Sequence, residues 1–176
     1  MKNFLKQREG AEYMMTFKEA VEDLNVLGIS GPQIYLLDII PLVEMIWADG
    51  VAQASELAIL NEYLHKRVEQ IKKIAGYQVV DFENAWAFAL RFIRKRPLPA
   101  FLRRLRSLVG PIILSSSDSQ YVNSILRRLI EACTDMAANA VRRYPDGLHD
   151  RFDEEERCFV EILKTFRNVE MVASLP

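Results

Sequence analysis

The stretch from Asp38 to Glu56, DIIPLVEMIWADGVAQASE, decides how the rest of this 176-residue chain is interpreted. It predicts the second half of a very apolar helix, a stop at Asp49-Gly50 and an acidic start to the next helix. Asp38 precedes Asp49-Gly50 by eleven residues, and Asp135 precedes a second Asp-Gly pair, Asp146-Gly147, by the same number. Eleven residues of an α-helix turn through about 1100°, close to three whole turns, so the two aspartates of each copy are expected on one face. The sequence therefore predicts a repeated helix–turn–helix unit.

Helical periodicity, capping residues and Gly or Pro stops divide the chain into seven predicted helices. Capping boxes are predicted at Thr16 with Glu19 and at Ser30 with Gln33. Pro41 lies inside the second helix and is expected to kink it, because proline lacks a backbone N–H. No run has the two-residue alternation of a strand bounded by hairpin turns, so the predicted fold is all-α. The predicted helices cover residues 17–27, 30–48, 55–75, 81–94, 100–109, 119–143 and 153–168.

Length and composition predict one domain. Half of the residues are hydrophobic, and neither side of a break at Pro97 to Pro99 has enough helices to bury its own apolar faces. We assign residues 1–15 to an N-terminal extension, 16–168 to the helical domain and 169–176 to a loosely held tail. No segment approaches the roughly 20 apolar residues of a membrane-spanning helix. Cys133 and Cys158 lie in helical patterns without a metal-ligand spacing, so we expect reduced thiols in a cytoplasmic protein.

The segment Ile46-Trp47-Ala48-Asp49-Gly50, with Glu56 at the head of the next helix, resembles the signature of the TerB-like, tellurite-resistance family. The resemblance covers about residues 16–168 and implies an all-helical domain of about seven helices in two halves. It also implies a binding or adaptor module of a stress response, with a protein partner that can belong to a membrane-associated complex. The second half departs from the pattern, since Pro145 stands where the family has alanine and the loop after Gly147 is longer.

A further implication of the resemblance is an acidic, divalent-cation-binding face where the two Asp-Gly turns meet. Hard cations such as Ca²⁺, Mg²⁺ and Mn²⁺ prefer oxygen ligands. The counterpart of Glu56 in the second half is ambiguous: the apolar register selects Glu155, counting from the Asp-Gly pair selects Asp153, and Glu156 is a third choice. The candidate ligands are Asp49, Glu56, Asp146 and Glu155.

Helix capping explains the same carboxylates more simply. Asp-Gly is a common helix-stop turn, and acidic residues in a first helical turn favour the positive end of the helix dipole. Asp38 and Asp135 are expected only to hydrogen-bond a hydroxyl or to pair with an arginine, as lone carboxylates on buried helices do. Both the capping and the cation-binding interpretations stay open at this stage.

The segment from Arg91 to Arg106 contains seven basic residues and no acidic one. Its arginines Arg94, Arg103 and Arg104 are candidates for contact with a partner: an anionic membrane, a nucleic acid or the acidic turns of a second subunit in a homo-oligomer. The simpler expectation is a solvated face whose arginines pair with acidic helices of the same fold. A net charge of −1 gives no convincing nucleic-acid signal.

Catalytic motifs are missing from the sequence. It has no Gly-x-Ser-x-Gly, no phosphate-binding glycine loop and no Cys/His pair at a recognisable spacing. The sequence therefore favours a non-enzymatic binding module. A metal-dependent enzyme that uses paired carboxylates and an oligomer-forming structural protein are the alternatives.

Overall fold

A computed structural model describes residues 15–143 and 149–173 of the chain. These residues form seven α-helices and one 3-10 helix, with no strand among them, so the prediction of an all-α fold of about seven helices is confirmed. In chain order the elements are α1 (Phe17–Val26), the 3-10 helix η1 (Gly31–Ile39), α2 (Ile40–Ile46), α3 (Ala54–Ala75), α4 (Phe82–Ile93), α5 (Pro99–Ile113), α6 (Ser119–Arg143) and α7 (His149–Ala173).

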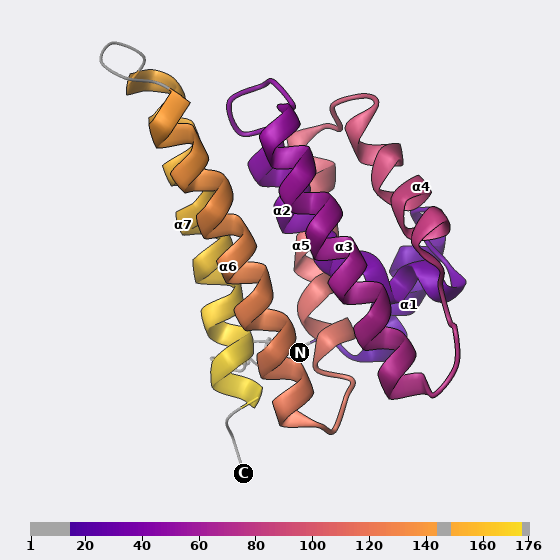
Figure 1. Cartoon of the computed structure of the whole chain (residues 1–176). Helices are drawn as coiled ribbons and strands as arrows, with labels where there is room; N and C mark the ends of the chain where they lie inside the picture. Colours follow the sequence, from indigo (N-terminus) through magenta and orange to yellow (C-terminus); the bar gives the residue numbers. More distant parts are fainter. Residues whose placement is uncertain (1–14, 144–148, 174–176) are drawn as a thin grey trace, which may run out of the picture.

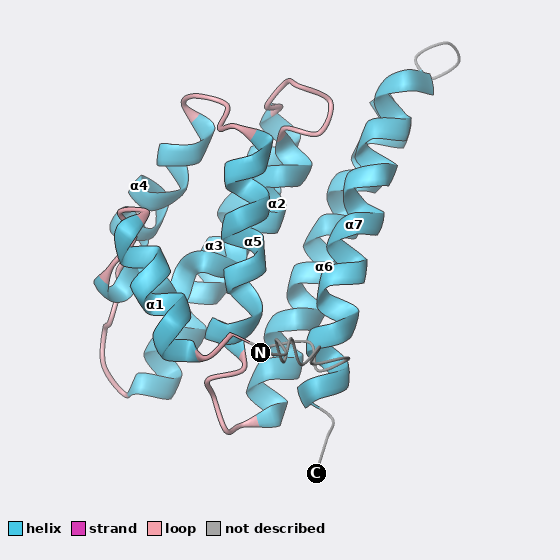
Figure 2. Ribbon diagram, turned by 180° about the vertical axis from the view of Figure 1, so that it is seen from behind, coloured by secondary structure: helices cyan, strands magenta, loops and turns pink. Residues whose placement is uncertain are grey.

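Two helical hairpins lie side by side in the molecule (Figure 1). One consists of α2 and α3 and the other of α6 and α7, and α6 packs against both helices of the first hairpin. Helix α5 lies behind α2, while α1 and α4 cover the side away from α7 (Figure 2). The α2–α3 turn lies at the same end of the molecule as the end of α6 and the start of α7 (Figures 1 and 2). We call this the turn end and the opposite end, where α3 finishes and α6 begins, the base.

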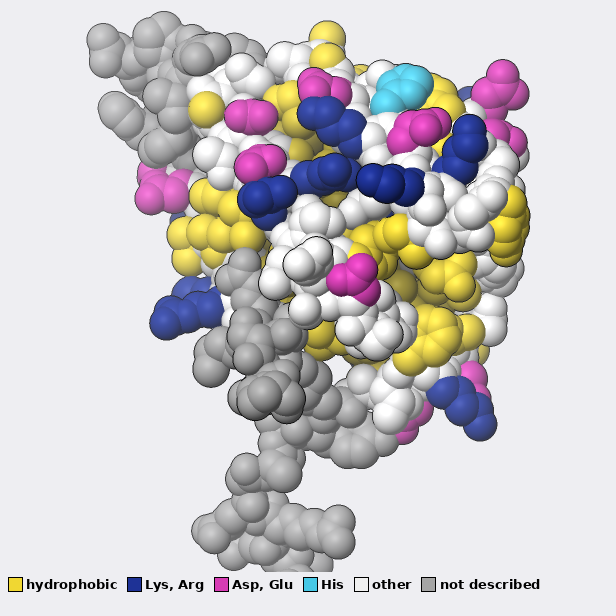
Figure 3. Space-filling view, turned by 60° about the horizontal axis from the view of Figure 1, so that its bottom comes forward, with side chains coloured by type: hydrophobic (Ala, Val, Ile, Leu, Met, Phe, Trp, Pro, Cys, Tyr) yellow, Lys and Arg dark blue, Asp and Glu magenta, His cyan; other side chains and the backbone are white. Residues whose placement is uncertain are grey.

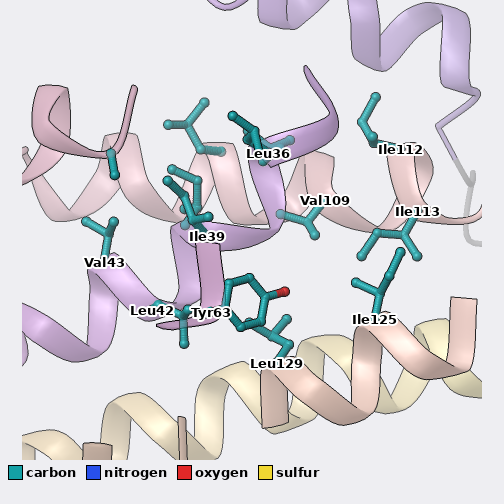
Figure 4. Close-up of a cluster of buried hydrophobic side chains, with 14 of the residues drawn as sticks. Leu36, Ile39, Leu42, Val43, Tyr63, Val109, Ile112, Ile113, Ile125 and Leu129 are labelled. Carbon is teal, nitrogen blue, oxygen red and sulfur yellow. The ribbon is translucent and has the colours of Figure 1, made fainter. Parts of the chain in front are cut away.

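The short helix α2 is the centre of the core, as its composition predicts. Every residue of α2 except Glu44 is buried. Leu42 and Val43 lie in one cluster with Leu36 and Ile39 of η1 (Figure 4). Helices α3, α5 and α6 close the cluster around α2, so elements from both hairpins share one core.

The segment before α2 differs from the predicted α-helix over 30–48. It is a 3-10 helix as far as Ile39, and Ser30 makes no side-chain capping bond. Pro41 explains the change, because in an α-helix its N–H would bond to the carbonyl of Leu37. Proline has no such donor, and the Leu37 carbonyl accepts from the N–H of Ile40 in the tighter pattern instead. Gln33, the other half of the predicted capping box, accepts from Arg91 at 3.1 Å.

The predicted end of α5 at residue 109 is wrong, because the helix continues through Gly110 and Pro111 to Ile113. Gly110 is buried, and a Cβ atom built there would lie 3.1 Å from Cγ2 of Val169 on α7. Helix α7 is also longer than the predicted 153–168, since it begins at His149 and ends at Ala173. Val169 is buried, so the chain beyond residue 168 begins as packed helix rather than as a loose tail. Packing between α5 and α7 explains both extensions.

Other boundaries agree closely with their sequence signals. The Thr16 and Glu19 capping box is present at α1, and Gly76, with φ of 78°, ends α3. Asp81 caps α4 through the N–H of Asn84 at 2.7 Å. Within the described ranges no single helix is long and apolar enough to cross a membrane, and α1 meets that test only when joined to the segment Gly31–Ile46 across a 98° bend.

Candidate functional site

At the turn end, the carboxylates of Asp49 and Glu56 shape the α2–α3 turn. Oδ1 of Asp49 accepts from the N–H of Val51 at 2.9 Å, and Oδ2 accepts from Nε2 of Gln53 at 3.0 Å. Oε2 of Glu56, a fully buried side chain, accepts from the N–H of Gln53 at 3.0 Å. Gly50 has a φ of 88°, which favours glycine at the turn. Both carboxylates thus have the capping roles offered by the simpler explanation, and their role as metal ligands stays a prediction.

The second half of the predicted cation site is only partly described. Asp146 lies outside the described residues. Glu155 is buried, with 1% of its surface exposed, whereas Asp153 and Glu156 are exposed. Glu155 therefore matches the buried Glu56 in environment, as the apolar register suggests. No group of three or more His, Cys, Asp or Glu residues that could hold a metal ion occurs in residues 15–143 and 149–173.

Asp38 does what a lone carboxylate on a buried helix is expected to do. Its Oδ2 accepts from the Tyr63 hydroxyl at 2.6 Å and lies 2.8 Å from Nε of Arg67. Asp135, its counterpart in the repeat, is exposed. The two copies therefore place their first aspartates in different environments. The expectation that Asp38 and Asp49 share one α-helical face also fails, because Asp38 belongs to the 3-10 helix.

Arg67 joins three elements in the interior of the base. Its side chain is 5% exposed, and Nη2 donates to the carbonyl of Tyr35 on η1 at 3.0 Å. Nη1 donates to the hydroxyl of Tyr121 on α6 at 2.8 Å and to Oε1 of Gln70 at 3.3 Å. Burial lowers the pKa of Arg67, but Asp38, Tyr121 and Tyr63 together outweigh burial and raise the pKa above its ordinary value. Arg67 therefore stays charged, and removal of Asp38 alone would leave an uncompensated buried cation.

A pocket of about 270 Å³ lies between η1, α3, α5 and α6 at the base, and the buried residues Asp38 and Arg67 are among those that line it. Tyr35, Ile74 and Tyr77 line it as well and are 44%, 57% and 67% exposed, so they mark its mouth. Figure 3 looks toward the base and shows hydrophobic side chains gathered there beside a row of Lys and Arg. The Tyr63 hydroxyl, which bonds to Asp38, points toward Ile113 and Ile125 (Figure 4). The apolar walls include Ile34, Leu37, Ile71, Val109, Ile113 and Ile125.

Oδ1 of Asp38 has no hydrogen-bond partner among the described residues, although the side chain is buried. Buried carboxylate oxygens nearly always accept hydrogen bonds, and one that does not costs free energy. The pocket therefore combines apolar walls with an unsatisfied acceptor in one of the residues that line it.

Glu44, whose side chain is 9% exposed, lies between α2, α5 and α7. Its Oε2 is 3.2 Å from Nη1 of Arg106, whose Nη2 is 3.5 Å from Glu161 on α7. Burial raises the pKa of Glu44, Arg106 lowers it and Glu161 raises it, with a net value of about 7. Glu44 and Cys158 line a hollow of about 210 Å³, and burial raises the pKa of the Cys158 thiol to about 12. The thiol is thus a poor nucleophile at neutral pH.

In the basic segment from Arg91 to Arg106, two arginines pair with acidic residues of the same fold, as the simpler interpretation predicts. Arg104 pairs with Asp23 of α1, and Arg106 lies buried between Glu44 and Glu161. Arg94 and Arg103 are exposed. Two of the three predicted partner-binding arginines are therefore accessible, while Arg104 is tied to its own fold.

Apart from Asp38, the residues around the pocket were not predicted from the sequence, although one signal was present. Arg67 lies four residues after Tyr63 and four before Ile71, within the apolar stripe of α3. A charged residue on such a stripe is buried and must find a buried partner. Only the folded chain brings Asp38 and Tyr121 to it.

No family model, curated protein or solved structure matches this chain, so its resemblance to the TerB-like family stays a prediction.

Proposed function

We propose that this chain is a non-enzymatic binding module that holds a small apolar molecule in the pocket at its base. The observation that carries this proposal is the pocket itself, whose apolar walls surround a small number of buried polar groups. Ligand sites are typically apolar cavities with a few polar groups that fix orientation. At about 270 Å³ the cavity suits a molecule smaller than an ordinary drug.

The walls of the pocket come from elements that the core already holds in place. The ion pair between Asp38 and Arg67 connects η1 to α3, and the hydrogen bond from Arg67 to the Tyr121 hydroxyl connects α3 to α6. A ligand entering the pocket would need little ordering of the protein, which favours affinity.

Calorimetric titration with indole and with indene, two bicyclic molecules of nearly the same shape, tests the proposal. Wild-type protein is expected to bind at least one of them. Ile71→Phe enlarges a wall residue into the cavity and is expected to abolish binding. Ile59→Phe makes the same change on the same helix outside the pocket and is expected to leave binding intact. If wild type binds neither molecule at millimolar concentration, the proposal fails.

Binding of a divalent cation at the turn end is a second candidate function. The resemblance to the TerB-like family would make the chain a stress-response module with a protein partner. The support for cation binding is that the α2–α3 turn and the start of α7 lie at one end of the molecule, each with a buried glutamate, Glu56 or Glu155. Stability measured against the concentration of Ca²⁺, Mg²⁺ or Mn²⁺ tests this candidate.

The enzymatic alternative would rest on Glu44, the carboxylate with a raised pKa that lines a hollow. A catalytic base needs access to the atom that it deprotonates. Glu44 instead faces Arg106, which holds α2 and α7 together through Glu44 and Glu161. We therefore assign Glu44 a structural role.

A further inference from the structure

We infer that the pocket selects neutral apolar molecules that carry one O–H or N–H group, and that this group donates its hydrogen to Oδ1 of Asp38. The inference rests on the proposed function, because it names the class of molecule that the pocket takes.

The hydrogen-bonding pattern of Asp38 requires a donor. Oδ2 already faces two donors, the Tyr63 hydroxyl at 2.6 Å and Nε of Arg67 at 2.8 Å. Oδ1 has none within the described part of the chain, and only 2% of the residue is exposed. A ligand hydroxyl or N–H group would satisfy this oxygen, whereas a ligand without a donor would leave it unsatisfied in a drier environment.

Charge favours a neutral ligand. Asp38 and Arg67 are the only charged residues among those that line the pocket in the described structure, and they compensate each other. A bound cation would repel Arg67 and a bound anion would repel Asp38, while either would lose its hydration. A neutral donor avoids both costs and still meets the free acceptor.

The pocket also limits size. Its volume of about 270 Å³ and its apolar walls suit one bicyclic ring system or a short branched chain. The exposed residues at the mouth lie on η1, near the end of α3 and just after it, whereas Asp38 is buried. The donor group of the ligand is therefore expected to enter first.

Comparing indole with indene separates the contribution of the hydrogen-bond donor to affinity from that of molecular shape, because indole has an N–H where indene has a CH₂. Wild-type protein is expected to bind indole about tenfold more tightly than indene, the effect of one hydrogen bond to a charged acceptor. Calorimetry at pH 7 gives both dissociation constants.

Asp38→Asn tests whether Oδ1 is the acceptor. The Tyr63 hydroxyl donates to Oδ2 and the charged Nε of Arg67 lies 2.8 Å from it, so the amide oxygen of asparagine is expected there and its NH₂ group at the position of Oδ1. The NH₂ group would oppose the N–H of indole. The preference for indole over indene is therefore expected to disappear, and benzofuran, whose ring oxygen accepts, is expected to gain on indole.

A second variant covers the case in which Asp38→Asn does not fold with Arg67 still charged. Asp38→Leu/Arg67→Met removes both charges together, a replacement that buried ion pairs often tolerate. It too is expected to bind indole and indene with similar affinity. Thermal unfolding of each variant shows whether the fold is retained.

The outcomes distinguish the two claims. If wild type binds neither molecule, the proposed function fails and the inference falls with it. If wild type binds both with equal affinity, the pocket is a ligand site but the inference is overturned. A preference for indole that persists in both variants also overturns it, because another group would then accept the N–H.

Discussion

At the scale of single residues, two carboxylates with little exposed surface, Asp38 and Glu44, differ in how well their negative charge is compensated. Asp38 is matched by Arg67 and Tyr63, so its charge is compensated. Glu44 shares Arg106 with Glu161, and burial outweighs the attraction of the arginine. As a result the proton on Glu44 is held far more tightly in the folded protein than in a solvated glutamate.

Glu44 is expected to make stability depend on pH. Its pKa is about 7 in the folded protein against an ordinary value of 4.5, so between these values the folded state retains a proton that the unfolded chain loses. The stability that Glu44 contributes is therefore fully present below pH 4.5 and is lost as pH rises to 7. The total is on the order of 3 kcal/mol. Urea unfolding at pH 5 and pH 7.5 is expected to show a smaller decrease in Glu44→Gln than in wild type.

Glu131→Gln is the matched control for this measurement. Glu131 is an exposed glutamate on α6 that pairs with Arg127, 4.0 Å away. Its replacement is expected to preserve the wild-type pH dependence. An equal decrease in wild type and Glu44→Gln would show that the Glu44 carboxyl does not retain its proton.

At the scale of elements, the contact between α5 and α7 depends on a missing side chain. Gly110 lets the two helices approach so closely that a Cβ atom would meet Cγ2 of Val169 at 3.1 Å. Glycine inside a helix costs about 1 kcal/mol relative to alanine, so the close approach is the physical reason for glycine here.

A double-mutant cycle tests this contact. In a Val169→Ala background, Gly110→Ala is expected to stabilise the protein, because the alanine methyl finds space and favours the helix. In wild type the same change is expected to be less favourable by about 1–2 kcal/mol, since it overpacks the contact. Free energies of unfolding for the four proteins give the coupling, and additive effects would mean that α5 and α7 do not constrain each other at this position.

The same elements show how far the sequence alone could go. Local signals, such as the capping box at Thr16 and Gly76 after α3, predict their boundaries well because the bonds are made between neighbouring residues. The ends of α5 and α7 could not be predicted, because Gly110 stops a helix by local rules and continues it here through contact with Val169. The 3-10 form of η1 follows from Pro41, for which the sequence predicted only a kink. The pocket beside η1 depends on partners distant in sequence, above all Arg67 and Tyr121.

At the scale of the whole molecule, the two hairpins run in the same sense, with the start of α3 and the start of α7 at one end (Figures 1 and 2). This is the arrangement that a shared cation site would need. The predicted ligands Asp49 and Glu56 come from one hairpin and Glu155 from the other. Asp146 lies beyond the described residues.

If a cation binds at the turn end, it is expected to stabilise both hairpins together. Adding Ca²⁺, Mg²⁺ or Mn²⁺ to about a hundredfold excess over Kd would raise the free energy of unfolding by about 2.7 kcal/mol. Asp49→Asn/Asp146→Asn is expected to lose this response, since its side chains keep an acceptor oxygen but lose their charge. Thermal unfolding followed by circular dichroism measures the shift.

The control removes two negative charges elsewhere. Asp135→Asn/Glu83→Gln changes two exposed residues on α6 and α4 and is expected to respond to the cation as wild type does. Identical responses from all three proteins would reject the turn end as a cation site.

The 3-10 geometry of η1 determines the length of the segment that connects α1 to α2 at the centre of the fold. Nine residues at a rise of about 2.0 Å span about 18 Å, whereas nine residues of α-helix span about 14 Å. Rewinding η1 into an α-helix would shorten it by about 4 Å and rotate Tyr35 and Asp38 away from Arg67. Pro41 therefore affects residues that it does not contact. Because it lacks the N–H that an α-helix would need, η1 keeps its longer 3-10 form, in which Arg67 contacts both the carbonyl of Tyr35 and the carboxylate of Asp38.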